Sequence, residues 1–193
     1  MNESKPDIAA LALELVGEFS KLQDTVDNMV RMYAEKRAPS LAQFLADMNT
    51  LDRLSDIQRP RLVISIAKEL ETTADLSKFG DVFRQVKDVR DFVAHGTFTE
   101  RVSDDELRIW NNYLSGPNIK RSGIKKLGDS LLVTRPELTA RLKEARWLIL
   151  HVHYIVGSSD LTEAIYLGEQ AVTFVEPPAD PRQWNEQVLT CEL

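Results

Sequence analysis

The sequence has a single cysteine among its 193 residues. Because Cys191 has no second cysteine to pair with, the chain forms no internal disulfide and no cysteine-based zinc site. Chains without disulfides are typical of reducing compartments, so we expect a cytoplasmic protein. The first residues also lack the basic stretch and apolar run of a secretion signal, which favours the same compartment.

Long apolar runs and the common catalytic motifs are also missing. The longest apolar run, Trp147 to Val156, contains two histidines and has about half the length that a membrane span needs. The sequence contains no glycine-rich phosphate loop, no Ser-His-Asp spacing, no zinc pattern and no repeat of roughly 20 to 50 residues. We therefore expect no membrane association, no metal and no cofactor.

Positive charge is in the minority, since 24 lysines and arginines stand against 30 aspartates and glutamates, for a net charge of −6. This balance counts against nonspecific binding to nucleic acid, which depends on releasing counterions from many phosphates. Four cations nevertheless lie close together in a stretch with glycine and proline: Lys120, Arg121, Lys125 and Lys126. They are either solvated loop charges or a basic loop that contacts RNA.

The remaining composition, 43% hydrophobic and 28% charged, is that of an ordinary globular protein. Hydrophobic residues recur mainly at steps of three and four, so we expect a mainly α fold, a bundle of about five to six helices. Asp7 to Arg37 is predicted to form one long helix whose apolar seam has nearly coiled-coil spacing. At ~1.5 Å per residue this helix spans about 45 Å, which is long for one domain. Its overhang offers a docking face to a second copy, so we predict a homodimer.

The other predicted helices are shorter and have start signals of their own. Pro60 suits the first turn of a helix, and Thr134 with Glu137 has the spacing of a capping box. The expected segments are Ser40 to Met48, Pro60 to Leu70, Leu76 to His95, Thr134 to about Val156, and Asp160 to Ala171.

A small β insertion is expected between the helix from Leu76 to His95 and the helix that begins at Thr134, at about residues 97–134. The β-like runs are Thr97 to Val102, Leu107 to Trp110 and Ser130 to Thr134. We expect an antiparallel hairpin with the basic loop near its tip, where Trp110 and Tyr113 either stack on bases or pack the hairpin onto the helices. The helical domain is thus placed at residues 1–175, and a proline-rich C-terminal tail at residues 176–193.

Arg90 occupies an unusual position in the fourth predicted helix. Apolar residues recur from Phe79 to Val93 along one side and, at roughly 100° per residue, Arg90 falls inside this stripe. Its guanidinium stays charged, so it needs a carboxylate, a phosphate or a water-filled cleft. Glu69 and Glu71 are candidate partners in the sequence.

The run Arg90-Asp91-Phe92-Val93-Ala94-His95-Gly96 resembles the HEPN superfamily, in which an arginine, often followed by a polar residue, precedes a histidine near a helix end. The resemblance implies an all-helical domain that commonly dimerises so that two such motifs face one cleft. Many members are metal-independent endoribonucleases, often toxins or defence effectors, and others retain the fold without the activity. The resemblance therefore implies RNA as substrate and, for a toxin, a protein inhibitor or antitoxin as partner. A second run, Arg146 to His151, lacks the polar residue and lies inside an apolar helix, so we treat it as coincidence.

The residue types suit metal-free RNA cleavage. The attacking 2′-hydroxyl must lose a proton, the leaving 5′-oxygen must gain one, and the phosphorane charge must be stabilised. We expect Arg90 to hold the phosphorane, His95 to transfer protons, and Asp91 to orient one of the two. On a regular helix Arg90 and His95 diverge by roughly 140° and ~7.5 Å, so unwinding at Gly96 or a twofold partner would complete the site. The alternative is a non-catalytic HEPN-like module that binds a partner protein or a nucleotide, with Arg90 held in an ion pair.

Overall fold

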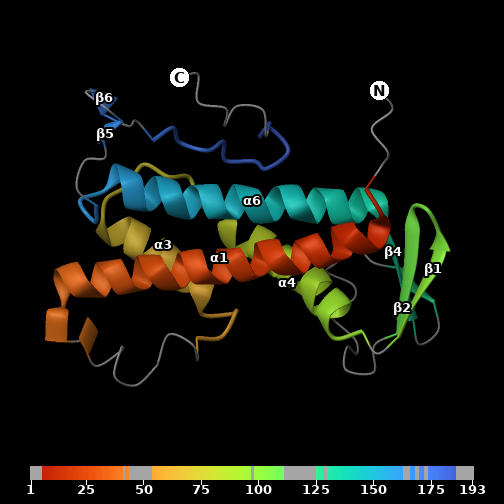
Figure 1. Ribbon diagram of the computed structural model, residues 1–193. Helices are drawn as coiled ribbons and strands as arrows, with labels where there is room; N and C mark the ends of the chain where they lie inside the picture. The colour runs from red at the N-terminus through yellow and green to blue at the C-terminus, as the bar shows by residue number, and fades with distance from the viewer. Residues whose placement is uncertain are drawn as a thin grey trace. The chain divides into compact units, whose positions relative to one another are not determined.

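The computed structural model describes residues 6–40, 42–43, 54–96, 98–110, 125–127, 130–162, 166–167, 170–171 and 174–185. Across these ranges the chain is mainly helical, which confirms the predicted class (Figure 1). The helices are α1 (Ile8–Arg37), α3 (Arg59–Glu69), α4 (Phe79–Ala94) and α6 (Arg135–Ser158). None of the helices in these ranges has both the length and the apolar character to cross a membrane.

The strands form two antiparallel sheets. The larger sheet has the order β1-β2-β4-β3, and the smaller pairs β5 with β6. The strands are β1 (Phe98–Ser103), β2 (Glu106–Trp110), β3 (Lys125–Leu127), β4 (Ser130–Thr134), β5 (Tyr166–Leu167) and β6 (Gln170–Ala171).

Among the described residues, the helices are fewer than predicted. The segment Asp160 to Ala171, predicted as a sixth helix, instead contains β5 and β6, with Tyr166 paired to Ala171 and Leu167 to Gln170. The helix prediction was wrong because apolar spacing in so short a segment fits a helix and a pair of short strands alike. Most of the predicted helix from Ser40 to Met48 lies outside the described residues.

The predicted β insertion is a four-stranded sheet and not a simple hairpin. The three β-like runs correspond to β1, β2 and β4, and β3 was not predicted because Lys125 and Lys126 were assigned to a basic loop. β3 pairs with β4 alone and is an edge strand, where lysine is common because it opposes further strand pairing.

The chain divides into two compact units, and each is described on its own. The first contains residues 1–20 and 81–145, and the second contains residues 21–80 and 146–193. The divisions fall inside α1 and α6, so each of these helices contributes one segment to each unit.

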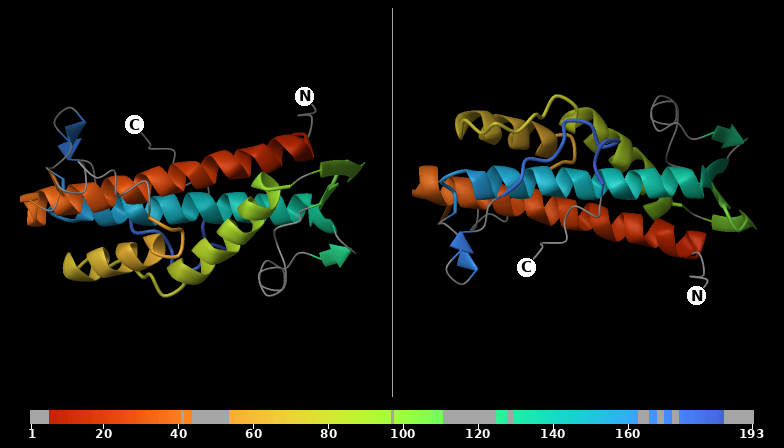
Figure 2. Two further views of the ribbon diagram at one scale, coloured as in Figure 1. Left: turned by 90° about the horizontal axis from the view of Figure 1, so that it is seen from below. Right: turned by 90° about the horizontal axis from the view of Figure 1, so that it is seen from above.

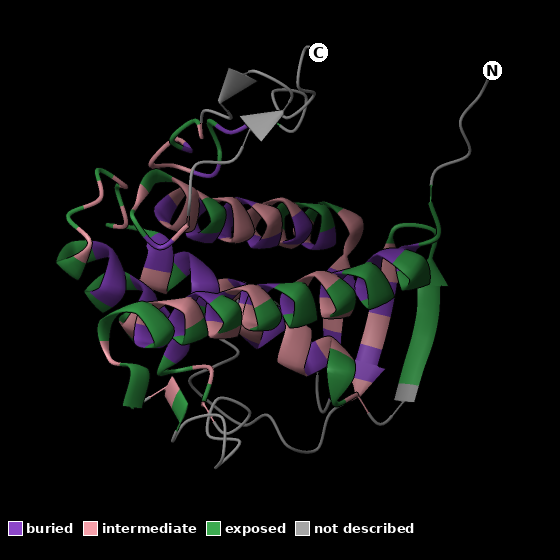
Figure 3. Ribbon diagram, turned by 60° about the vertical axis from the view of Figure 1, so that its left-hand side comes forward, coloured by how far each residue is buried: buried purple, intermediate pink, exposed green. Residues whose placement is uncertain are grey.

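The core of the first unit joins one face of the sheet to helical stripes. Leu107 of β2 pairs with Val133 of β4, and Ile109 pairs with Leu131, so these four buried side chains lie on one face. Figure 3 shows the contrast with β1, which is exposed where it is described. The buried helical residues are Ile8, Leu11, Leu15, Phe19, Val82, Phe83, Val86, Val89, Leu138 and Leu142.

The start of α6 confirms the predicted capping box. The backbone N–H of Thr134 donates to the Glu137 carboxylate at 2.9 Å, and the Glu137 N–H donates to the Thr134 hydroxyl at 3.4 Å. These reciprocal bonds satisfy two backbone donors that a helix start would otherwise leave without partners.

The second unit buries a set of large side chains around the C-terminal half of α6. Trp147 is fully buried, and its ring lies 4.1 Å from the ring of His151 and 6.4 Å from that of Phe79. Residues Phe174–Asn185, which we call the strap, have no helix or strand, yet they lie along α6 (Figure 2). Most of the strap falls in the segment predicted as a tail, and it contributes the buried Trp184.

Candidate functional site

Arg90 lies on α4, in the part of this helix that belongs to the first unit. The apolar stripe of this helix is buried through Val82, Phe83 and Val86, as the sequence period predicts. The Arg90 side chain is 15% exposed, and its guanidinium carbon lies 4.1 Å from the centre of the Phe19 ring. This distance allows a cation–π contact, which stabilises a charge inside an apolar stripe.

Asp91 connects two cations of the same helix. One carboxylate oxygen lies 2.5 Å from Lys87 Nζ, and the other lies 3.2 Å from a terminal nitrogen of Arg90. All three side chains are mostly buried, so these contacts are less screened by water than surface pairs are. We call Lys87, Arg90 and Asp91 the α4 charge cluster.

Lys87 was missed by the sequence reasoning. The signal that would have found it is the spacing of Lys87 and Asp91, since side chains four residues apart on a helix are neighbours. The glutamates proposed as partners for Arg90 lie in the second unit, where Glu69 accepts a hydrogen bond from Tyr33. That hydrogen bond, followed by burial, raises the pKa of Tyr33.

His95 is exposed directly after the end of α4 at Ala94. Its backbone N–H donates to the Asp91 carbonyl at 3.0 Å, so the chain is still helical in this turn. Asp91 and His95 are therefore four residues apart on one helical face, one turn from each other. Arg90 remains on a different side of the helix from His95, as a regular period requires.

Gly96 is required by the packing of β2 onto this helix end. A Cβ atom added at Gly96 would lie 2.6 Å from Cγ2 of the buried Ile109. The final glycine of the motif thus has a structural role, because only a residue without a side chain permits this approach.

The predicted RNA-binding loop is described only in part. Lys120 and Arg121 lie outside the described residues, as does Tyr113. Lys125 and Lys126 belong to β3, where they pair with Leu132 and Leu131 of β4. RNA binding by these residues stays a prediction.

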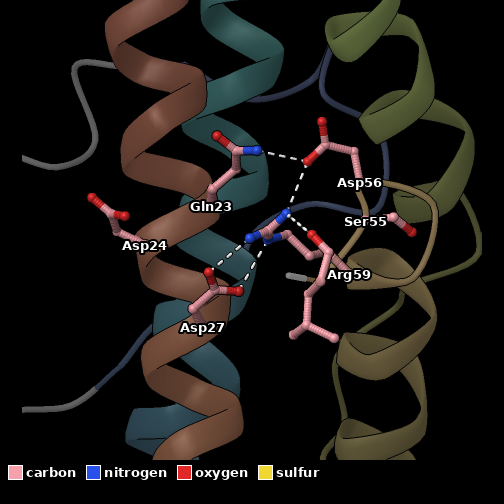
Figure 4. A pocket seen from close by; sticks show the side chains of 7 residues that line it. Gln23, Asp24, Asp27, Ser55, Asp56 and Arg59 are labelled. Carbon is pink, nitrogen blue, oxygen red and sulfur yellow. Dashed lines mark hydrogen bonds and ion pairs between the residues drawn. The ribbon is translucent and has the colours of Figure 1, made fainter. Parts of the chain in front are cut away.

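A polar hollow in the second unit contains another dense group of charges (Figure 4). Its lining residues are Gln23, Asp24, Asp27, Leu54, Ser55, Asp56 and Arg59. Arg59 is buried and donates to Asp27 through two nitrogens, to Asp56 at 3.0 Å and to the Leu54 carbonyl. A guanidinium with so many bonds to its own chain is suited to joining α1 to α3 and not to binding an anion.

Three features therefore limit the chemistry of the described parts. Within them, no group of three or more His, Cys, Asp or Glu side chains is arranged to hold a metal ion. The α4 charge cluster places the cation Arg90 about one helical turn before the exposed His95, and the Arg59 group is structural. No protein-family model, no curated protein and no solved structure matches this chain.

Proposed function

We propose that the chain is a HEPN-like, metal-independent endoribonuclease of the toxin or defence type. The observation that supports the proposal best is the position of His95, exposed one helical turn after the partly buried Arg90–Asp91 pair. A fixed cation and a solvent-accessible imidazole that reach one phosphate are the minimum that metal-free phosphodiester cleavage needs.

In this mechanism each residue has one task. His95 takes the proton of the attacking 2′-hydroxyl or returns one to the leaving 5′-oxygen. Arg90 binds the phosphorane oxygens, and Asp91 keeps the guanidinium in place through its 3.2 Å contact. The products are a 2′,3′-cyclic phosphate and a 5′-hydroxyl.

A second copy of the chain completes the site in this proposal. Arg90 and His95 lie on different sides of α4, so one helix does not bring both to a single phosphate. A twofold axis beside the helix end would place His95 of one protomer near Arg90 of the other. Lys120, Arg121, Lys125 and Lys126 are proposed to hold the RNA strand, and a protein inhibitor or antitoxin is proposed to control the enzyme.

The test compares purified wild type with His95→Ala on total RNA in EDTA, over a range of protein concentrations. We expect wild type to cut RNA to 2′,3′-cyclic phosphate ends, and the variant to be slower by about 100-fold or more, which is typical for loss of a general acid or base. His153→Ala is the matched control, since His153 is exposed on α6 and lies in the second unit. Intact RNA at every wild-type concentration, or equal cleavage by His95→Ala, would refute the nuclease.

The second candidate is a non-catalytic HEPN-like module that binds a partner protein or a nucleotide. The observation that favours it is the low exposure of Arg90, 15%, together with its ion pair to Asp91. Under this proposal Arg90→Met lowers the melting temperature, whereas His95→Ala changes neither stability nor any RNA.

A further inference from the structure

The strap (Phe174–Asn185) is bound to the second unit without any helix or strand. Pro177, Pro181 and Trp184 are nevertheless buried. The backbone hydrogen bonds recorded within the strap are its own, from Gln183 to Asp180 and from Trp184 to Pro181. In its hydrogen bonds to α6 and to residues 73–78, at least one of the two partners is a side chain.

The central contact has the chemistry of proline-rich peptide recognition. The indole N–H of Trp147 donates to the carbonyl of Pro178 at 2.7 Å. The strap carries Pro177-Pro178-Ala179-Asp180-Pro181, which contains the spacing Pro-x-x-Pro. Proline-rich segments bind beside aromatic side chains because proline rings restrict the backbone before binding. In the strap the backbone bends at Ala179 and Asp180 and turns from Pro181, so the shared feature is this restriction and not a fully extended form.

Charged and polar contacts before and after Pro178 in the chain fix the position of this segment. Lys78 Nζ lies 2.5 Å from the Asp180 carboxylate. Glu176 accepts hydrogen bonds from the Thr73 hydroxyl at 3.2 Å and from the Asp75 N–H at 3.3 Å. Contacts with Arg182 and then Lys78 hold the pKa of Asp180 far below its usual range, so this carboxylate stays ionised.

Phe174 anchors the start of the strap on Gly157 of α6. A Cβ atom at Gly157 would lie 2.5 Å from the Phe174 ring, so the ring occupies the space that any other residue would fill. This anchor lies outside the Glu176–Trp184 stretch, which makes it possible to loosen the strap without changing the groove.

We infer that Trp147, Lys78 and Thr73 form a groove for an acidic, proline-rich peptide, that the strap occupies this groove in cis, and that a partner protein with such a segment displaces it. The occupant is assigned from the strap itself, whose prolines meet an indole donor and whose carboxylate meets a lysine. The inference does not rest on the proposed nuclease.

Competition from the strap sets the affinity for a partner. A tethered ligand acts at an effective concentration of about a millimolar. A free peptide with the same contact residues must compete with the strap, so it binds the wild-type chain weakly. Any change that weakens the strap and leaves the groove intact should therefore tighten binding in trans.

The experiment titrates a fluorescent peptide with the sequence from Glu176 to Trp184 into the full chain. In the Asp180→Lys variant the strap loses its pair with Lys78, whereas the free peptide keeps its own aspartate. We expect the peptide to bind this variant about fivefold more tightly than wild type, the equivalent of one exposed ion pair. Gly157→Ala loosens the strap through Phe174 instead and should act in the same direction, which covers the case that Asp180→Lys does not fold.

Two control measurements make the result specific. A peptide with alanine in place of Pro178 and Pro181 should bind less tightly to Asp180→Lys, and so should the parent peptide when Trp147→Phe is added. Equal binding of the peptide to wild type and both loosened variants, or equal binding of the alanine peptide, would overturn the inference. A wild-type dimer that dissociates on addition of the peptide would assign the groove to a second copy and overturn the choice of a partner protein.

Discussion

Arg59 and Asp27 join α3 to α1 through two parallel hydrogen bonds, from Nε to Oδ1 at 3.0 Å and from Nη2 to Oδ2 at 2.8 Å. The Arg59 side chain is 7% exposed, so the pair is shielded from water. Asp56, which also accepts from Gln23, lies on the other side of the guanidinium (Figure 4). One cation therefore compensates two partly buried carboxylates.

Arg59→Ala should destabilise the protein by about 3 kcal/mol, because it removes the buried guanidinium that pairs with both carboxylates. Urea unfolding at neutral pH measures this loss. Arg84→Ala is the control, since its pair with Asp81 is exposed, and we expect a change within about 0.5 kcal/mol. Equal effects of the two substitutions would show that the buried ion pairs of Arg59 contribute no more to the free energy of unfolding than an exposed ion pair does.

Gly157→Ala and Gly17→Ala should change stability in opposite directions. Nothing lies within 4 Å of a Cβ added at Gly17, so alanine should stabilise α1 by about 0.5 to 1 kcal/mol through its higher helix propensity. At Gly157 the same gain is offset by displacement of the Phe174 ring, and we expect a net loss of about 1 kcal/mol. Thermal melts of the two variants decide this, and stabilisation by both would argue against the close approach of Phe174.

Thr134→Ala should cost about 1 kcal/mol, because it removes the hydroxyl that caps the start of α6. Thr139→Ala is the control, as Thr139 is exposed within the same helix and alanine is the better helix former. Chemical denaturation of both variants would show the expected difference, and a neutral Thr134→Ala would mean that the cap adds nothing.

Local patterns account for the features that the sequence predicted correctly. The α1 seam, the α4 stripe and the pairing of Thr134 with Glu137 depend on residues within about one or two helical turns, whose spacing is set by helix geometry. β3 escaped detection because its lysines are stabilised as an edge strand only once β4 lies beside them.

The candidate site was predictable in position and not in its contacts. The helical period places Arg90 in the buried stripe, but its pairing with Asp91 depends on side-chain packing that the period does not specify. The strap shows the same limit more strongly. The proline run predicts the absence of regular structure at Pro177–Pro181, whereas the hydrogen bond from Trp147 joins residues 31 positions apart and no local pattern indicates it.

Acid should destabilise the second unit through His151. This imidazole is fully buried, and its Nδ1 donates to the Trp147 carbonyl at 3.0 Å. Burial lowers the pKa of His151 below its usual 6.5, and the nearby Glu176 and Asp75 offset this only in part.

The sign follows from proton binding. Below pH 6.5 the unfolded chain protonates this histidine while the folded chain keeps it neutral, so stability is complete above that pH and falls as the pH decreases toward the lowered pKa. The loss approaches about 1.4 kcal/mol per pH unit for one group. His151→Leu removes this proton-linked loss of stability. In urea unfolding, the free energy of unfolding of the variant relative to wild type should therefore rise as the pH decreases from about 7 to about 5, the range that spans the usual histidine pKa. Parallel plots of stability against pH for wild type and His151→Leu would mean that His151 is protonated equally in the folded and unfolded states. That result would contradict a buried neutral imidazole.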